Sequence, residues 1–510
     1  MVVQVDGLGT NQQRKFDVRL LHHMHVGYSP ATTADQNNVG RVTIDILPDD
    51  VLLEIFDFYV VQANVFIPDN RWQTLAHVCR KWRNVIFESP SRLNLQLACS
   101  ERTPVRETLD VWPLLPIIIL HIVHSKYSTF GLDNIVAALE HNDRIRQITL
   151  KLFADQQSKS ILGAMQEPFP ALTTLMLSGD KTAPDIPDSF FGGSAPHLRS
   201  PSLDHILFPG LSKFLLSATD LVHLDLWSIP HTGYISPEAM ATCLSALTRL
   251  NGLRMEFVSP RSHPNRESRR LPQLTRAVLP NLIRLHFKGV SEYLEDLVAR
   301  IDAPRLKRLE MKFFHQLILD TPQLVQFITR TPNLKACDQA RIYFSDLEVI
   351  VTFPRTSSDS NNGFNLTISC RQPEWQLSAM AQVCSSSFPP SIIHKVERLY
   401  IRKRSTMLKW QDDFEDSQWL ELLHPFTGVK YLHLSDEFAR FAPSLRELVG
   451  GRTTEVLPAL QGLFLEKYPS SGPFKEAIGK FVAARRLFNL PVAVYYGDGS
   501  NDNVEVRSFG

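Results

Sequence analysis

The six cysteines are the first residues whose chemistry could define a function, because thiolates bind metals and act as nucleophiles. They are Cys79, Cys99, Cys243, Cys337, Cys370 and Cys384. None forms a C-x-x-C pair, which excludes a zinc site of the RING type. Six cysteines in 510 residues are also too few for a disulfide scaffold, so we expect the chain to fold in a reducing compartment.

The sequence also lacks the common catalytic motifs. It contains no phosphate-binding G-x-x-x-x-G-K-[ST], no metal-binding H-E-x-x-H and no nucleophile turn of the form G-x-S-x-G. Cys79 stands among apolar residues at helical spacing, where a small packed side chain is a more common role than a nucleophile. We therefore expect no enzymatic activity, no cofactor and no metal site.

A unit of the form L-x-x-L-x-L, with Ile, Val, Met or Phe allowed, recurs along most of the chain. Nine copies start at Ile145, Leu172, Leu221, Leu250, Leu282, Leu306, Val396, Val429 and Leu460. A degraded copy, Leu198-Pro201-Leu203, fills one gap, and two poorer copies are expected near Leu334 and Leu366. Most intervals are roughly 23 to 33 residues, close to those of leucine-rich repeats. With amphipathic segments between the copies, the pattern predicts an α/β fold, an irregular leucine-rich-repeat solenoid or horseshoe.

The repeat phase also predicts a binding surface. In such strands the Leu side chains point into the core, and the intervening side chains point onto the inner surface. The candidate target-binding residues at these positions, here named the basic stripe, are Arg254, Arg284, His286, Lys288, Arg308, Lys312, Arg398, Tyr400 and Arg402. Because Arg pairs with carboxylate or phosphate through two hydrogen bonds, the stripe indicates an acidic or phosphorylated target. The alternative is a set of scattered, solvated charges.

Ahead of the repeats, the residues from Ile44 predict a small helical module. Pro48 can open a helix, and Asp49, Asp50 and Glu54 place negative charge near its positive end. One apolar stripe on this helix would consist of Leu52, Ile55, Phe56 and Tyr59. A second helix is expected from about Trp72 to Phe87, with an apolar face of Leu75, Val78, Cys79, Trp82 and Ile86.

The segment Ile46-Leu-Pro-Asp-Asp-Val-Leu-Leu-Glu-Ile-Phe, followed by Leu75-Ala-His-Val-Cys-Arg-Lys-Trp-Arg, resembles an F-box. Leu47-Pro48 matches the Leu-Pro start of that family, and Val78-Cys79-Arg80-Lys81-Trp82 matches its Val-Cys-x-x-Trp block. The stretch from Val60 to Arg71 is longer than in a standard F-box. The remainder, to about residue 490, is similar to the F-box-like leucine-rich-repeat proteins of fungi.

This resemblance implies a substrate receptor of an SCF-type ubiquitin ligase. The F-box would bind a Skp-type adaptor, and through it a cullin, while the solenoid holds a target protein near the ubiquitin-charged enzyme. The implied adaptor-binding residues are Leu47, Pro48, Leu52, Ile55, Phe56, Leu75, Val78, Cys79 and Trp82. Two alternatives remain open. These residues could face only the first repeats, or the chain could be a leucine-rich-repeat interaction scaffold that does not assemble a ligase.

Length and charge set the remaining bounds. A chain of 510 residues exceeds a single core of roughly 250–300 residues, which favours several domains or a repeat array. With 54 basic and 53 acidic residues, we expect neither a nucleic acid nor a membrane as partner. The N-terminus lacks a signal-peptide pattern, so a cytoplasmic or nuclear location is expected. The expected divisions are a disordered tail at 1–42, the helical module at 43–98, the solenoid at 99–490 and a C-terminal tail at 491–510.

Overall fold

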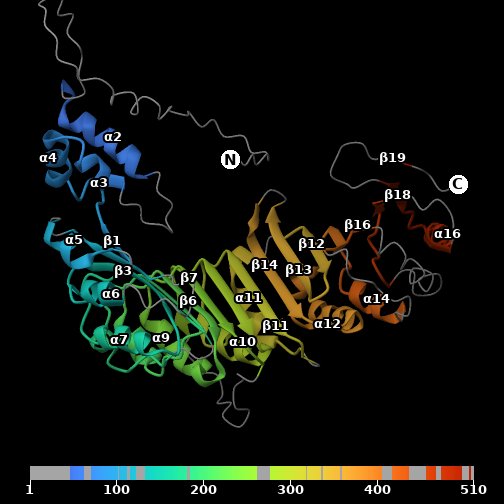
Figure 1. Ribbon diagram of the computed structural model, residues 1–510. Helices are drawn as coiled ribbons and strands as arrows, with labels where there is room; N and C mark the ends of the chain where they lie inside the picture. The colour runs from blue at the N-terminus through green and yellow to red at the C-terminus, as the bar shows by residue number, and fades with distance from the viewer. Residues whose placement is uncertain are drawn as a thin grey trace, which may run out of the picture.

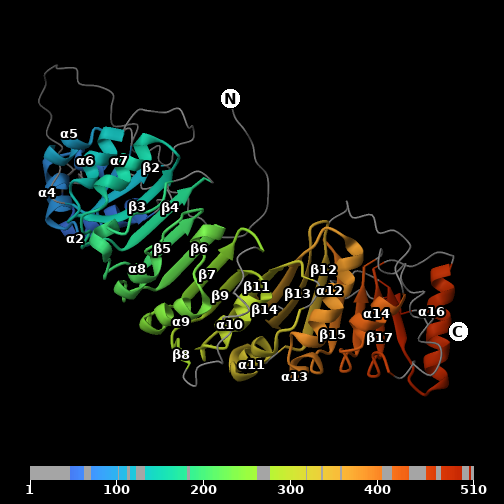
Figure 2. The ribbon, with the colours of Figure 1, turned by 90° about the horizontal axis from the view of Figure 1, so that it is seen from below.

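The chain folds into a curved array of strands with helices along one side (Figure 1, Figure 2). The computed structural model describes residues 46–61, 71–100, 103–111, 115–121, 132–180, 184–260, 276–316, 319–334, 337–356, 359–404, 416–435, 455–466, 473–496 and 505–506. The expected tail at 1–42 and the stretch 62–70 of the helical module lie outside these residues. Within the described residues, 17 strands form one mostly parallel sheet.

Nine strands of this sheet carry the nine repeat copies. They are β3 (Ile145–Leu152), β4 (Thr174–Gly179), β6 (His223–Ile229), β7 (Gly252–Phe257), β9 (Arg284–Gly289), β11 (Arg308–Phe314), β15 (Arg398–Lys403), β16 (Tyr431–Leu434) and β17 (Gly462–Leu465). Their register places equivalent leucines side by side, as in the row Leu253, Leu285 and Leu309. The degraded copy forms β5 (Ser200–Asp204), in which Pro201 and Leu203 are buried. The sheet confirms the prediction of an α/β repeat solenoid.

The long interval between the copies at Leu306 and Val396 holds an antiparallel insertion. Its strands are β12 (Gln339–Phe344), β13 (Glu348–Thr356) and β14 (Asp359–Ser369). The third strand in sequence, β14, lies parallel to β11, while β12 lies parallel to β15, and β13 runs antiparallel between them.

This antiparallel insertion shifts the positions at which the two poorer repeat copies begin. Ala340 and Ile342 lie beside Leu399 and Ile401, so the first unit begins later than Leu334. Leu334 itself is buried in the short 3-10 turn η5 (Pro332–Leu334). Leu366 lies beside Met311 and ends a unit rather than starting one. The strands that continue the parallel array, β12 and β14, therefore lie near Leu334 and Leu366, where the two poorer copies were expected, but neither leucine starts a unit. The chain reverses twice here, and a pattern that assumes one direction cannot locate this pairing.

Helices cover the face of the sheet into which the leucines point. They are α5 (Val105–Val111), α6 (Leu132–Leu139), α7 (Gln156–Ala164), α8 (Leu211–Ser217), α9 (Pro237–Ala246), α10 (Ser291–Val298), α11 (Pro322–Arg330), α12 (Pro373–Ser386), α13 (Pro390–Ile393), α14 (Asp416–Leu423) and α16 (Pro473–Leu487). None of the helices in the described ranges is both long and apolar enough to cross a membrane.

A polar contact between two consecutive helices joins neighbouring repeats. The carboxylate of Glu295, on α10, accepts hydrogen bonds from the backbone N–H groups of Gln323 (2.9 Å) and Leu324 (2.7 Å) at the start of α11. These N–H groups have no partner inside their own helix. Burial raises the pKa of Glu295 to about 7 even though both N–H groups favour its charged form. The cap therefore couples α11 to the preceding repeat.

The sheet extends beyond the repeat copies at both ends. Before the first copy, β1 (Leu97–Ser100) and β2 (Ile117–His121) pair in parallel and lead into β3. After the last copy, β18 (Ala493–Tyr496) pairs in parallel with β17, and β19 (Glu505–Val506) returns antiparallel. The boundary expected at 490 therefore falls too early, because backbone hydrogen bonding continues without the leucine pattern. A separate two-stranded sheet joins β8 (Ala277–Val278) and β10 (Ile301–Asp302).

The antiparallel insertion requires a glycine at position 363 on β14, and this requirement can be tested. Its φ is +127°, and a Cβ there would stand 2.2 Å from the carbonyl oxygen of Phe353. We expect Gly363→Ala to destabilise the protein by at least about 2 kcal/mol, measured as a lower melting temperature by circular dichroism. The control is Gly479→Ala in α16, where a Cβ meets nothing within 4 Å. It should stabilise by about 0.5–1 kcal/mol. Equal melting temperatures for the two variants would contradict the strand assignment.

Candidate functional site

The N-terminal module consists of three helices rather than the two expected. They are α2 (Asp49–Val61), α3 (Arg71–Ala76) and α4 (Arg80–Glu88). The expected single helix from Trp72 to Phe87 was wrong because Cys79 has an extended backbone (φ −154°, ψ 170°) and starts a new helix. Its Sγ atom accepts a hydrogen bond from the backbone N–H of Trp82 at 3.4 Å. Cys79 is thus a half-buried helix cap.

The predicted adaptor-binding residues divide into a buried and an exposed group. Leu52, Phe56, Leu75 and Trp82 are buried in a core that also contains Leu93, Leu95, Leu97 and Leu115 from the start of the solenoid. Phe56 and Trp82 pack with their ring centroids 4.9 Å apart. Leu47 and Cys79 are partly buried against the same core. Pro48, Ile55 and Val78 are exposed.

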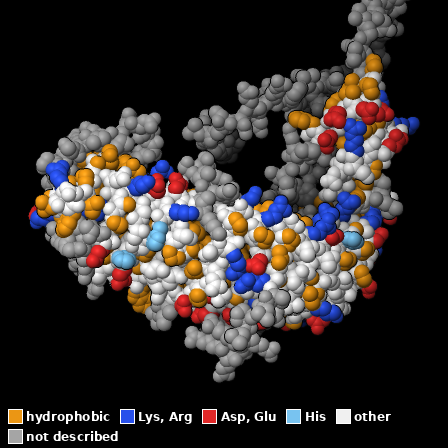
Figure 3. Space-filling view, turned by 180° about the vertical axis from the view of Figure 1, so that it is seen from behind, with side chains coloured by type: hydrophobic (Ala, Val, Ile, Leu, Met, Phe, Trp, Pro, Cys, Tyr) orange, Lys and Arg blue, Asp and Glu red, His pale blue; other side chains and the backbone are white. Residues whose placement is uncertain are grey.

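The first helix of the module has a second apolar face that the sequence reading did not separate. Val51, Ile55 and Phe58 of α2 follow one another at helical spacing and are 42%, 43% and 60% exposed. Val78, at the junction of α3 and α4, is 56% exposed. Figure 3 shows hydrophobic side chains at the surface of this module next to a gathering of Asp and Glu. The signal was present, since apolar residues of α2 extend well beyond the side that packs on the core, and only Asp50, Glu54 and Asp57 form an acidic stripe along the helix.

The structure places the first six residues of the basic stripe together on three adjacent strands. Arg254 lies beside His286, Arg284 beside Arg308, and Lys288 beside Lys312. Most of these charges already have a partner. Arg308 is hydrogen-bonded to Glu310, and Lys312 to Glu348. Within the described residues, Arg284 has no ion pair. The excess of positive charge is therefore smaller than a count of residue types suggests.

His286 lies between two carboxylates at the centre of this region. Its Nε2 atom is 2.9 Å from Glu256 Oε1, and its Nδ1 atom is 2.8 Å from Glu310 Oε2. Burial by itself lowers the pKa of His286, but the two glutamates outweigh burial and raise it above 6.5. The hydrogen bond with His286 lowers the pKa of Glu310 to about 2. Burial raises the pKa of Glu256, but His286 and the neighbouring basic side chains together lower it by more, so the pKa of Glu256 is also below its ordinary value.

The other three members of the stripe, Arg398, Tyr400 and Arg402, lie apart from these on β15. There Tyr400 begins a row of stacked rings that continues through His433, Phe464 and Tyr495, with centroids 4.2, 4.3 and 4.4 Å apart. Burial and then Arg402 and Arg398 lower the pKa of His433 to about 4, so its ring is neutral at pH 7. The repeat phase identified Tyr400. It could also have identified His433 and Phe464, because they occupy the equivalent positions in β16 and β17. Tyr495 lies in β18, where the leucine pattern is absent, and only the pairing of β18 with β17 places it in the row.

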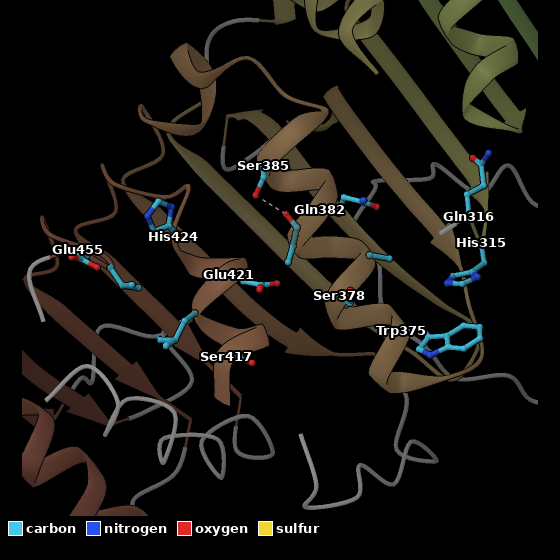
Figure 4. Close-up of a pocket in the computed structure, with 14 residues that line it drawn as sticks. His315, Gln316, Trp375, Ser378, Gln382, Ser385, Ser417, Glu421, His424 and Glu455 are labelled. Carbon is cyan, nitrogen blue, oxygen red and sulfur yellow. Dashed lines mark hydrogen bonds between the residues drawn. The ribbon is translucent and has the colours of Figure 1, made fainter. Parts of the chain in front are cut away.

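A groove of about 830 Å³ lies among the helices α12 and α14, away from the basic stripe (Figure 4). The ring of Trp375 stacks on His315 with centroids 4.8 Å apart at its edge. Gln382 accepts a hydrogen bond from the backbone N–H of Leu319 at 3.1 Å, and Ser385 donates to the Ala381 carbonyl at 2.9 Å. The first of these bonds joins α12 to the chain ahead of α11, and the second lies within α12. The sequence reading did not identify this groove.

Comparison with known proteins gives a match among solved structures. No protein-family model and no curated protein matches the chain. Among solved structures, it is similar to the leucine-rich repeat-containing protein LegL7 from Legionella pneumophila. The two are 12% identical with a TM-score of 0.26, and the match covers 76% of this chain and 97% of that one.

The position of His286 predicts a dependence of stability on pH. Because its folded-state pKa is raised, its contribution is complete below pH 6.5 and is lost as pH rises through the raised value. The contribution of Glu310 is present above its ordinary pKa of 4.5 and is lost as pH falls toward 2. We expect His286→Gln to lower the free energy of unfolding by about 1–2 kcal/mol between pH 4.5 and 6.5, and by less at pH 8.5.

Thermal melts of wild type and His286→Gln at pH 5.5 and 8.5 measure this difference. The matched control is His424→Gln, since His424 is exposed on the α14 side. A deficit of the same size at both pH values would show that His286 contributes packing and not charge.

Proposed function

We propose that this protein is the substrate receptor of an SCF-type ubiquitin ligase. On this proposal the N-terminal module binds a Skp-type adaptor, and through it a cullin, while the inner face of the sheet binds a target protein. The protein has no catalytic residue, metal or cofactor of its own in this role, and it works in the cytoplasm or nucleus. Catalysis would come from proximity, because holding the target near an activated thioester raises its effective concentration.

The single observation that carries the proposal is the second apolar face of the module. One face of α2 already packs through Leu52 and Phe56 into the shared core, so Val51, Ile55 and Phe58 are not needed there. Exposed apolar side chains that follow one helix face mark an interaction surface more often than chance exposure. The Leu-Pro start and the Val-Cys-x-x-Trp block of the sequence point to an adaptor as the partner.

The second candidate is an interaction scaffold that does not assemble a ligase. One observation favours it: the module shares its core with the first strands of the solenoid. The indole Nε1 of Trp72 donates to the carbonyl of Gln96 at 3.0 Å, and Leu97 and Leu115 complete the same core. Solenoids need a terminal cap to cover their first repeat. The module could serve only as that cap, and capture of an adaptor distinguishes the two functions.

Ile55 and Val78 supply the test, because both are exposed and neither belongs to the core. We expect Ile55→Ser combined with Val78→Ser to weaken capture of a Skp-type adaptor by more than about tenfold. Each buried apolar side chain of this size is worth about 1.5–3 kcal/mol. The melting temperature should stay unchanged. The measurement is a pull-down with purified adaptor, and Leu487→Ser, at a position 85% exposed on α16, is the control. Wild-type capture by the double variant would favour the scaffold.

A further inference from the structure

Two hollows lie next to each other on the strand face of the solenoid and share the side chain of Trp227. The first, about 480 Å³, is here named the apolar hollow, and Met176 and Trp227 are its large apolar side chains. Small polar residues such as Thr149, Ser178 and Ser202 also line it, together with one basic and one acidic side chain, Lys151 and Asp204. The second, about 420 Å³, is named the basic hollow and is lined by Arg254, Arg284 and Arg308.

Trp227 joins the two hollows through a cation–π contact. The guanidinium carbon of Arg254 lies 3.9 Å from the centroid of the Trp227 ring. This contact orients Arg254, whose ion pair with Glu256 is long at 3.6 Å. A planar guanidinium that is held by an aromatic ring keeps its N–H donors available to a second group.

The three arginines of the basic hollow differ in whether their guanidinium groups already pair with a carboxylate. Arg308 is hydrogen-bonded to Glu310. Arg284 is exposed and has no ion pair in the part of the chain that the structure describes. Asp225 also lines this hollow, so an incoming anion has to pair with the arginines on the side away from this carboxylate. Arg254 and Arg284 are therefore the donors available to a ligand.

We propose that these hollows together bind an extended peptide segment that carries one apolar side chain and one carboxylate or phosphate. The apolar side chain fills the apolar hollow, and the anion pairs with Arg254 and Arg284. This inference rests on the proposed role of the inner face in target binding, and it names the chemistry of the segment that the face accepts.

The strand register sets the spacing between the two groups of the peptide. Met176 on β4 lies beside Ser202, Ser202 beside Asp225, and Asp225 beside Arg254. Arg284 lies on the next strand, beside Gly252. With strands ~4.8 Å apart, Arg254 and Arg284 are about 14 and 19 Å from Met176 across the sheet. An extended peptide advances ~3.3 Å per residue, so the apolar and anionic residues stand about four to six positions apart.

The charges along the same path disfavour a nucleic acid as the ligand. Asp204 lines the apolar hollow, while Asp225 and Glu310 line the basic one. These carboxylates repel a backbone that carries a phosphate at every step, whereas a peptide with one anion avoids them. Arg254 covers one face of the Trp227 ring, so that face is not available to a stacked base.

Fluorescein-labelled peptides of Gly, Ser and Thr provide the test on the full-length protein. Each carries one Leu and either a Glu-Glu pair or a phosphoserine, separated by about two, five or nine residues, in both chain directions. Fluorescence polarisation should show tightest binding at the middle spacing, and added salt should weaken it. Binding of both anions supports the proposal through its shared chemistry, and binding of phosphoserine alone supports it and assigns the anion to phosphorylation.

Two substitutions locate the binding in these hollows. Trp227→Leu and Arg284→Gln should each weaken the best peptide by about tenfold, which corresponds to the loss of one charge-assisted or aromatic contact. Arg305→Gln, at an exposed arginine that hydrogen-bonds to Asn281 at 3.2 Å, is the matched control. Circular dichroism checks that each variant is folded. The proposal is overturned if affinity ignores spacing, if neither substitution weakens binding, or if labelled oligouridine binds more tightly and loses affinity in Arg284→Gln.

Adaptor capture by the same proteins separates this inference from the ligase assignment. Trp227→Leu and Arg284→Gln should capture a Skp-type adaptor as wild type does, because both sites lie in the solenoid. Peptide binding by a wild-type protein that captures no adaptor supports the hollows and removes the ligase assignment. Adaptor capture without any peptide binding removes the hollows and supports the ligase.

Discussion

The parallel register between successive strands is the constraint on which the rest of the structure depends. Because neighbouring repeat strands such as β6, β7, β9 and β11 pair at equivalent positions, their leucines form continuous rows on one side of the sheet. A single unit could not bury these leucines, but a neighbour on each side covers them. The same register forces the intervening side chains into rows on the opposite side. The binding surface is thus a direct consequence of how the core is built.

The rows on the strand face create interactions that no single repeat contains. His286 meets Glu256 on one neighbouring strand and Glu310 on the other, so three repeats contribute one side chain each to one cluster. The rings of Tyr400, His433, Phe464 and Tyr495 stack in the same way across four strands. Charged groups and ring faces that pair in this way are not available to bind a ligand. The groups available to a ligand are those left over, such as Arg284 and the edges of the apolar hollow.

The N-terminal module follows a related principle on a smaller scale. Three short helices cannot bury all the apolar side chains of α2 between themselves, and they share a core with the first strands. One side of α2 packs on this core, so the module covers the apolar side chains at the start of the solenoid. The opposite side, with Val51, Ile55 and Phe58, has no such explanation within the described part of the chain. A proposed adaptor would supply the missing contacts.

The sequence by itself determined the type of fold and the strands that carry the nine repeat copies, because hydrophobic periodicity is a local property of the chain. It also placed Arg254, Arg284 and Arg308 on the inner face, since side chains alternate along any strand. Only the tertiary structure decided the double reversal at β12–β14, the face of α2 that remains exposed, and the capping role of Cys79. It alone showed that Glu310 and Glu348 pair with members of the basic stripe. The pairing of Lys312 with Glu348 depends on a contact between residues far apart in sequence, and a repeat pattern contains no information about which distant side chains meet. The Cys79 cap is local, but it depends on backbone angles that apolar periodicity does not specify.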